Sequence, residues 1–188
     1  MAEQKNQNEH LNVEDALTQS EAFLIKYKNA IIGGVVAVII IVAGFIMYKN
    51  LYAEPREEKA QAALFKGQEY FEQDAFEQAL NGDSIGYTGF LKVADDYSGT
   101  KAANLAKAYA GICYAQLGKY EEAVKMLDSF NGKDQMVAPA ILGAAGNCYA
   151  QLGQLDKAAS TLLSAADKAD NNTLSPIFLI PVSYTHLR

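Results

Sequence analysis

The chain has 188 residues, of which half are hydrophobic and a fifth are charged, and its formal net charge at pH 7 is −6. A chain of this length holds one modest globular domain with appendages. The acidic balance and the lack of clustered Lys and Arg exclude nucleic-acid phosphates as the main ligand.

Residues 1–28 form a polar, acidic leader. Its first dozen residues show no sustained apolar period, which predicts disorder. Between Val13 and Tyr27 the apolar residues are spaced so that they could form a helix leading into the next segment. We interpret the leader as a solvated segment, with a partner-binding role as the alternative.

Residues 29–49 are predicted to form a transmembrane helix. The stretch from Asn29 to Tyr48 carries no charge and is rich in Ile and Val. About twenty residues at about 1.5 Å per residue span the roughly 30 Å of a bilayer's hydrocarbon core. A cleaved signal peptide is the competing interpretation, which the length of the block, its late start and the lack of a clear small-x-small cleavage site disfavour.

The orientation of this span follows less directly from the sequence. The flanking basic residues are nearly balanced, with Lys26 and Lys28 before the span and Lys49, Arg56 and Lys59 after it. The positive-inside rule therefore does not decide the matter. A short uncleaved leader followed by an anchor favours a cytoplasmic amino end.

One pattern occurs twice between Ala102 and Ala166, at a constant offset of 35 residues. The first copy reads Gly111-x-x-Tyr114-x-x-x-Gly118-x-Tyr120-x-x-Ala123-x-x-x-Leu127, and the second reads Gly146-x-x-Tyr149-x-x-x-Gly153-x-Leu155-x-x-Ala158-x-x-x-Leu162. A repeat of this length, with a Gly turn between two helical segments, predicts stacked pairs of helices.

The residue types in the repeat fit such a pair of helices. Gly111 and Tyr114 lie three apart and share a face, where the Gly allows a partner helix to approach closely. Gly118 and Gly153 are predicted to take the left-handed conformation that commonly ends a helix. Neither pair can bury its apolar stripe alone, so about three units are needed for a stable core.

A degenerate first copy precedes these two. Gly67, Tyr70, Phe76 and Ala79 reproduce the spacing, but the offset from Gly67 to Gly111 is 44, nine residues more than between the later copies. The helical pattern breaks at residues 81–83, and we expect a helical period to resume through Ile85, Tyr87, Phe90, Leu91 and Ala94. Asp83 occupies the slot of Leu127 and Leu162, which predicts a broken second helix.

These motifs resemble the tetratricopeptide repeat, or TPR. The sequence departs from that pattern at the usual Trp, where Lys107 and Leu142 stand, and at the closing Pro, where Gln135 and Asp170 stand. The resemblance implies an all-α fold, in which a single transmembrane helix is followed by a TPR α-solenoid over residues 50–180, with about three repeats and the start of a fourth. An unrelated helical bundle with chance spacing is the alternative.

Prolines mark the predicted starts of three helices. Pro55 and Pro139 are predicted in first turns, Pro139 at the first helical position, and Pro176 follows the capping Ser175 of a fourth repeat. Pro181 falls in the second turn of that fourth repeat, where Pro costs about 3 kcal/mol.

Residues 181–188 are similar to translated sequencing-adapter sequence. We therefore expect a non-native tail, a native chain that continues beyond Ile180, and an exposed apolar turn at residues 177–180.

The sequence offers no set of catalytic or metal-ligating residues. Its histidines are His10 and His186, in the leader and the suspect tail. Cys113 and Cys148 both lie two residues after a repeat Gly, so they occupy one structural position and are predicted to be small buried hydrophobes. We expect no metal, no cofactor and no small-molecule substrate, and an enzyme would need a site beyond Ile180.

A partner-binding groove is predicted on the concave side of the solenoid. Its lining follows from the TPR register, and the side chains are Gln68, Phe71, Ile112, Ala115, Gln116, Asn147, Ala150 and Gln151. The set contains no Lys or Arg, so it lacks the basic clamp that some TPR domains use on a peptide's terminal carboxylate.

The order of leader, span and repeats resembles bacterial membrane-anchored TPR proteins of the YfgM-like type, particularly those of Bacteroidetes. The resemblance implies a scaffold for protein–protein interactions in the bacterial inner membrane, with its TPR domain in the periplasm. It also implies partners at the Sec translocon or among periplasmic chaperones. The alternative is a structural subunit of an envelope transport or assembly complex, whose span packs into the complex.

Overall fold

A computed structural model describes residues 2–170 and 173–185. Helices account for 80% of the structure, and no residue in those two ranges lies in a strand. This confirms the predicted all-α class. The chain divides into two units, at residues 1–52 and 53–188, which are described separately.

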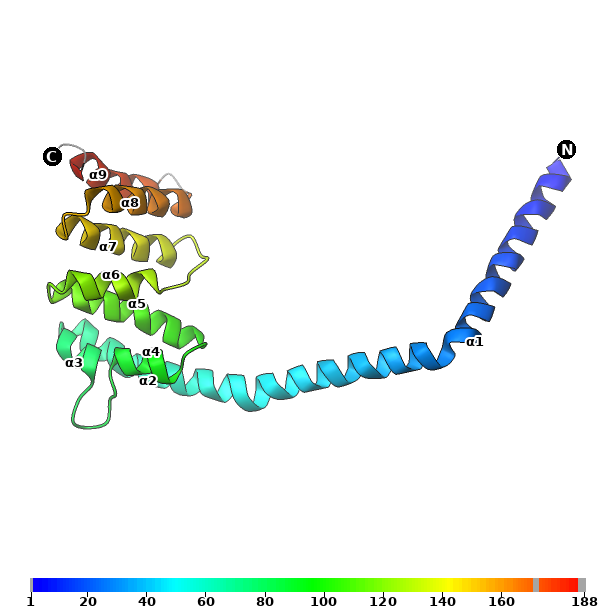
Figure 1. Cartoon of the computed structure of the whole chain (residues 1–188), viewed down its shortest axis with the longest axis horizontal. Coiled ribbons are helices and arrows are strands. Elements are labelled where there is room, and N and C mark those ends of the chain that lie inside the picture. The colour runs from blue at the N-terminus through cyan, green and yellow to red at the C-terminus, as the bar shows by residue number, and fades with distance from the viewer. Residues whose placement is uncertain (1, 171–172, 186–188) are drawn as a thin grey trace. The chain divides into compact units, whose positions relative to one another are not determined.

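The first unit is a long helix, α1 (Ala2–Tyr48), followed by the start of a short π-helical segment, η1 (Lys49–Ala53) (Figure 1). The side chains of residues 25–52 are exposed in this unit. Within the described residues, one helix near the amino end is long and apolar enough to cross a membrane. An exposed apolar surface of this length is stable in hydrocarbon and unfavourable in water.

The leader differs from its predicted disorder, because α1 already begins at Ala2. Residues 2–28 contain neither Gly nor Pro, and Ala, Glu, Gln, Lys and Leu are frequent among them. These residue types favour helix, and nothing in the segment interrupts the backbone hydrogen bonds that run back from the apolar block. The leader therefore extends the helix of the span.

The second unit stacks its helices in chain order (Figure 1). Successive helices pack against each other, and α2 also packs against α5. The helices are α2 (Glu54–Glu72), α3 (Phe76–Asn81), α4 (Phe90–Asp96), α5 (Lys101–Gln116), α6 (Tyr120–Asp128), α7 (Val137–Gln151), α8 (Leu155–Ala169) and α9 (Ser175–Thr185). The core consists of Ala, Leu, Ile, Val, Phe, Cys and Tyr side chains between these helices.

The turns within the repeats confirm the glycine prediction. Gly118 has φ 72° between α5 and α6, and Gly153 has φ 71° between α7 and α8. Residues 119 and 154 each donate a backbone hydrogen bond of 2.9 Å to the carbonyl of the repeat tyrosine. Asp74, with φ 57°, occupies the same place after α2, and the N–H of Ala75 bonds to the Tyr70 carbonyl at 2.9 Å. The three turns therefore share one geometry.

The loop after α3 corrects the prediction of a resumed helical period. Ile85 and Tyr87 lie in the loop between α3 and α4, and helix begins again only at Phe90. Gly82, Gly86 and Gly89 all have positive φ, at 91°, 115° and 89°. Such backbone is not helical, so the apolar spacing of this segment is not carried by a helix.

Two adjacent residues of α2 hold the turn between α4 and α5. The guanidinium of Arg56 donates to the carbonyl oxygens of Asp96 at 2.9 Å and Ser98 at 3.3 Å, beside the carboxyl end of α4. The carboxylate of Glu57 accepts from the N–H groups of Lys101 at 2.7 Å and Ala102 at 3.0 Å, at the amino end of α5. Each charge matches the sign of the helix dipole that it faces.

Glu57→Ala is expected to lower the free energy of unfolding by about 1–2 kcal/mol, because it leaves two N–H groups of α5 without their carboxylate partner. Urea unfolding of the detergent-solubilised full chain, followed by circular dichroism, measures the change. Glu58→Ala is the matched control, since Glu58 is the exposed neighbour of Glu57. Equal effects of the two substitutions would rule out the capping role.

The carboxyl-terminal helix continues through Pro181, which the sequence pattern predicted to break it. Val182 is 9% exposed and packs in one cluster with Ala159 and Leu162 of α8, and this packing offsets the hydrogen bond that Pro181 cannot donate. Ile177, Leu179 and Ile180 are 56%, 43% and 58% exposed, as predicted, whereas Phe178 is half-buried.

Pro55 lies in the first turn of α2, as predicted. Pro139 is the third residue of α7 rather than the first, and it is buried. The first turn extends to this position, where a missing N–H removes no intrahelical bond, so the shift costs little.

Candidate partner-binding surface

The repeat glycines lie where two helices of one pair touch. A Cβ on Gly111 would lie 2.5 Å from Cγ of Leu127, and a Cβ on Gly146 would lie 2.7 Å from Cγ of Leu162. Both distances are shorter than real carbon atoms allow, so only Gly permits this approach. The glycine and the leucine of each copy thus meet across the pair, as their spacing predicted.

The first copy fills the same space with different residues. A Cβ on Gly67 would overlap the Tyr87 hydroxyl and the Phe90 ring rather than Asp83, the residue at the corresponding sequence position. The carboxylate of Asp83 instead accepts hydrogen bonds from the Tyr70 hydroxyl at 2.5 Å and from the Tyr87 N–H at 2.9 Å. The Tyr70 hydroxyl bond is the main cause that lowers the pKa of Asp83.

Burial repeats along with the sequence pattern. Over residues 111–129 and 146–164, each position has the same degree of burial in both copies, except that Ile112 is half-buried where Asn147 is exposed. Equal burial at equivalent positions means that the two helix pairs present the same faces to their neighbours. Equivalent faces are what a stack of repeated units requires.

The repeat tyrosines Tyr114 and Tyr149 share a repeat position and a degree of burial, but their polar neighbours differ. Both are half-buried, and each lies beside the residue eight positions later, which is Glu122 in one copy and Lys157 in the other. The Nζ atom of Lys157 lies 5.4 Å from the ring centre of Tyr149. Tyr149 also donates a hydrogen bond of 2.5 Å to Asp128 of α6, which raises the pKa of Tyr149 to about 12.

The predicted groove residues of the first copy contact the next first helix. Gln68 donates from Nε2 to the Tyr109 hydroxyl at 2.9 Å, and the Phe71 ring meets the Tyr109 ring edge-on at 5.2 Å between centres. Both Gln68 and Phe71 are half-buried. They therefore help to join α2 to α5, and only part of each side chain is open to a ligand.

The other predicted groove residues differ in exposure. Ile112 and Ala115 of α5 are half-buried and pack against the core cluster that α5, α6 and α7 share. Ala150 is also half-buried. The amide side chains are the open ones, and they are Gln116, Asn147 and Gln151. Gln116 and Gln151 occupy equivalent positions 35 residues apart, so they place the same amide group on successive first helices.

Tyr109 also belongs to this surface, although it was not among the predicted groove residues. Its ring stacks on Phe90 at 5.2 Å, while its hydroxyl accepts from Gln68. Phe65 stands 44 residues earlier, at the equivalent position of the first copy, and is 60% exposed. An aromatic residue at one register position in two copies was the available signal.

One end of the stack is open to water and mostly charged. Ala102, Ala106, Ala110 and Cys113 are buried on the face of α5 that packs against the preceding copy. The residues 44 positions earlier on α2 are all exposed, and they are Glu58, Ala62, Lys66 and Glu69. A polar outer face is what a terminal repeat needs for solubility, and three of these four side chains are charged. This face of α2 is therefore polar and exposed.

Both cysteines are free and buried, as predicted from their shared position. Cys113 is 0% exposed and Cys148 is 3% exposed. Burial raises the pKa of Cys113 to about 12 and raises the pKa of Cys148, because it disfavours the charged thiolate.

Both thiols are therefore expected to resist iodoacetamide at pH 8 in the folded protein, since the thiolate is the reactive form. Both should react at the ordinary rate of a free cysteine once urea unfolds the chain. Mass spectrometry of the intact full-length protein counts the added groups. Rapid labelling of either residue before unfolding would show that its thiol is not buried.

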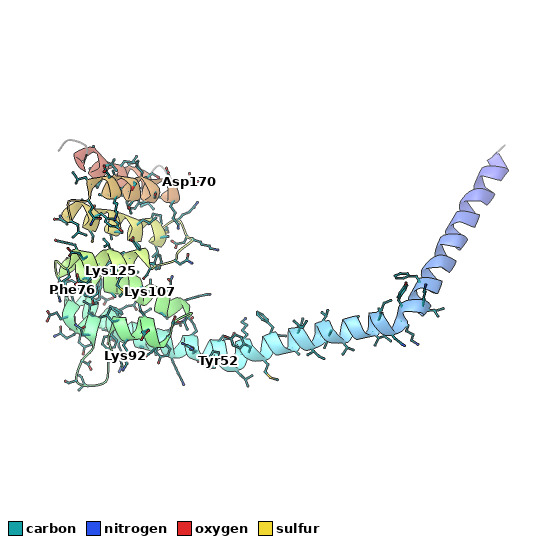
Figure 2. All side chains as sticks on the ribbon, viewed as in Figure 1. Tyr52, Phe76, Lys92, Lys107, Lys125 and Asp170 are labelled. Atoms are coloured by element: carbon teal, nitrogen blue, oxygen red, sulfur yellow. The ribbon has the colours of Figure 1, made fainter. Side chains whose placement is uncertain are left out.

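A shallow pocket beside the start of α5 includes Lys101, Asn104, Lys107 and Asn131 in its lining. The first N–H groups of α5 already bond to Glu57 and Thr100, so they are not directed at a ligand. Figure 2 shows Lys92, Lys107 and Lys125 on three different helices, α4, α5 and α6. Among the described residues, no group of His, Cys, Asp and Glu has the arrangement of a metal site.

Comparisons with known proteins identify no relative, since no family model, curated protein or solved structure matches the chain. The interpretation of the surface therefore depends on its residues alone.

Proposed function

We propose that this protein is a non-catalytic, membrane-anchored scaffold whose helical unit is a TPR-type α-solenoid that binds other proteins. The observation that carries the proposal is the repeated burial of residues 111–129 and 146–164, with a glycine against a leucine in each copy. Repeats of paired helices expose a long, regular surface, and such surfaces commonly serve protein recognition.

The residues proposed to contact the partner are the predicted groove residues, of which Gln116, Asn147 and Gln151 are the most open. Their amides both donate and accept hydrogen bonds, and the half-buried Ile112, Ala115 and Ala150 add apolar area beside them. An uncharged lining of this kind suits an extended protein segment more than a terminal carboxylate.

The apolar helix supports a membrane location, and we propose that this membrane is the bacterial inner membrane, with the amino end cytoplasmic and the helical unit periplasmic. Anchoring confines the unit to the membrane plane, which raises its effective concentration near other membrane-bound proteins. On the resemblance to YfgM-like proteins, we propose the Sec translocon or periplasmic chaperones as partners.

The second candidate is a subunit of an envelope transport or assembly complex. Gly33 and Ala37 lie four apart on α1, and a Cβ on Gly33 would meet no atom within 4 Å. Such a bare face permits close approach of another transmembrane helix. In this case the span, and not the helical unit, would make the main contact.

Photo-crosslinking of the full-length chain in native membranes tests the two candidates. A photoreactive residue is placed at Gln151, with the exposed Ser164 of α8 as the control position. In a second chain, polyleucine replaces residues 29–48. The scaffold predicts protein adducts at Gln151 in both chains.

Loss of the Gln151 adduct in the polyleucine chain would favour the subunit. Adducts at Gln151 no stronger than those at Ser164, in either chain, would contradict the scaffold. Both chains must fractionate with the membrane.

A further inference from the structure

The loop between α3 and α4 is the largest departure from the repeat. It covers residues 82–89 and contains the extra length that separates Gly67 from Gly111. Figure 1 shows this loop extending beyond the ends of both helices. The two later copies have no counterpart, because residues 120–128 and 155–169 are continuous helix there.

The base of the loop is fixed by contacts that leave little freedom. A Cβ on Gly82 would overlap the Tyr87 carbonyl oxygen, and a Cβ on Gly89 would overlap the Leu80 carbonyl oxygen. The backbones at the two ends of the loop are therefore in direct contact where they cross. The N–H of Asp83 bonds to the Tyr87 carbonyl at 2.9 Å. A loop closed in this way is ordered before any ligand arrives, which lowers the entropy cost of binding.

The Asp83 side chain restricts the loop further through hydrogen bonds. Oδ1 accepts from the N–H groups of Ile85 at 2.8 Å and Tyr87 at 2.9 Å, while Oδ2 accepts from the Tyr70 hydroxyl at 2.5 Å. The loop is thereby tied to α2 as well as to itself.

The loop points one large side chain inward and one outward. Tyr87 is 3% exposed and donates its hydroxyl to the Ala79 carbonyl at 2.9 Å. Ile85 is 87% exposed, the greatest exposure among the large hydrophobic side chains described. The ordered base of the loop thus serves to bury Tyr87 in the core. The tip contributes nothing to the core, yet it holds an isoleucine in water.

The sequence on either side of the loop, from Gly67 to Leu91, is acidic, and Lys92 of α4 follows directly after it. Residues 67–91 contain no Lys, Arg or His, and their carboxylates are Glu69, Glu72, Asp74, Glu77 and Asp83. An anionic lipid surface would be repelled by this charge, and so would the same region of a second copy. A protein pocket with basic residues around an apolar floor would be attracted.

We propose that residues 84–86 are a protein-docking tip, in which Ile85 enters an apolar pocket rimmed by Lys or Arg on a protein partner. The proposal rests on the scaffold function and adds to it a second contact, made by the tip of this loop. The rigid loop positions Ile85, the pocket removes it from water, and the carboxylates of residues 67–91 steer the encounter.

The test again uses the full-length chain in native membranes, with the photoreactive residue at Ile85, at Gln151 or at the control Ser164. The expected result at Ile85 is a discrete protein adduct at least roughly tenfold stronger than the Ser164 background. Sequencing of the crosslinked peptide should find Lys or Arg beside apolar residues. Glu72→Lys combined with Glu77→Lys, two exposed positions, should weaken the adduct several-fold.

The outcomes separate the loop from the scaffold. An adduct at Gln151 without one at Ile85 would overturn the docking tip and leave the scaffold standing, whereas failure at both positions would overturn both. Ile85 adducts to lipid or to a second copy of this chain would also overturn the tip. So would an Ile85 adduct that charge reversal leaves unchanged in a variant with the parent's circular dichroism and unfolding midpoint.

Discussion

Gly89→Ala is expected to lower the free energy of unfolding by about 3 kcal/mol or more. Gly89 has φ 89°, a conformation that costs an L-residue energy by itself. In addition, the new Cβ would overlap the Leu80 carbonyl oxygen and lie 2.5 Å from the Asn81 carbonyl carbon. These are backbone atoms and cannot rotate away, so the crossing of the loop must open.

Urea unfolding of the solubilised full chain measures this loss, and Gly86→Ala is the matched control. Gly86 also has positive φ, at 115°, but a Cβ at this residue would meet no atom within 4 Å. We expect it to cost only about 1 kcal/mol, the strain of the backbone alone. Similar losses for both variants would show that the backbone crossing at Gly89 does not exist.

Phe90→Ala is expected to cost about 3–5 kcal/mol, the usual range for removing a fully buried aromatic ring. Phe90 is 0% exposed, stacks on Tyr109 at 5.2 Å, and fills the space in front of Gly67. The cavity left behind would lie between α2, α4 and α5, where rigid helices limit collapse.

Phe65→Ala is the control for this second substitution, because Phe65 is 60% exposed on α2. It should change the free energy of unfolding by less than about 1 kcal/mol. The same urea experiment serves both variants. If Phe90→Ala lowered the free energy of unfolding no more than Phe65→Ala, the packing of Phe90 against Gly67 and Tyr109 would be contradicted.

The later two copies were predictable because each relation in them is local. Gly111 and Leu127 are separated by one short turn, and Gly118 supplies the residue type that enters that turn without strain. The burial of Cys113 and Cys148 also followed from register, since equivalent positions in stacked units face equivalent neighbours.

The first copy was predictable only in part. Its broken second helix was expected from Asp83, but the residues that replace that helix were not. Tyr87 and Phe90 reach Gly67 because the chain reverses direction in a loop with three glycines. In a helix the spacing of residues predicts which side chains share a face, but in an irregular loop it does not.

The candidate binding surface was also predictable only in part. The register named Gln116, Asn147 and Gln151, which are open, but it also named Gln68 and Phe71, which are partly covered by Tyr109. How much of a side chain remains for a ligand depends on the neighbouring helix, and a single repeat does not contain that neighbour.

The sequence by itself determined the apolar span, the helical class, the 35-residue repeat and the turn glycines, because periodicity and backbone preference act over a few residues. Only the tertiary structure decided that Glu57 caps α5, that Tyr87 and Phe90 complete the first copy, and that Ile85 is left in water. Each of these depends on contacts between segments far apart in the chain, or on the path of an irregular loop, and no local preference encodes them.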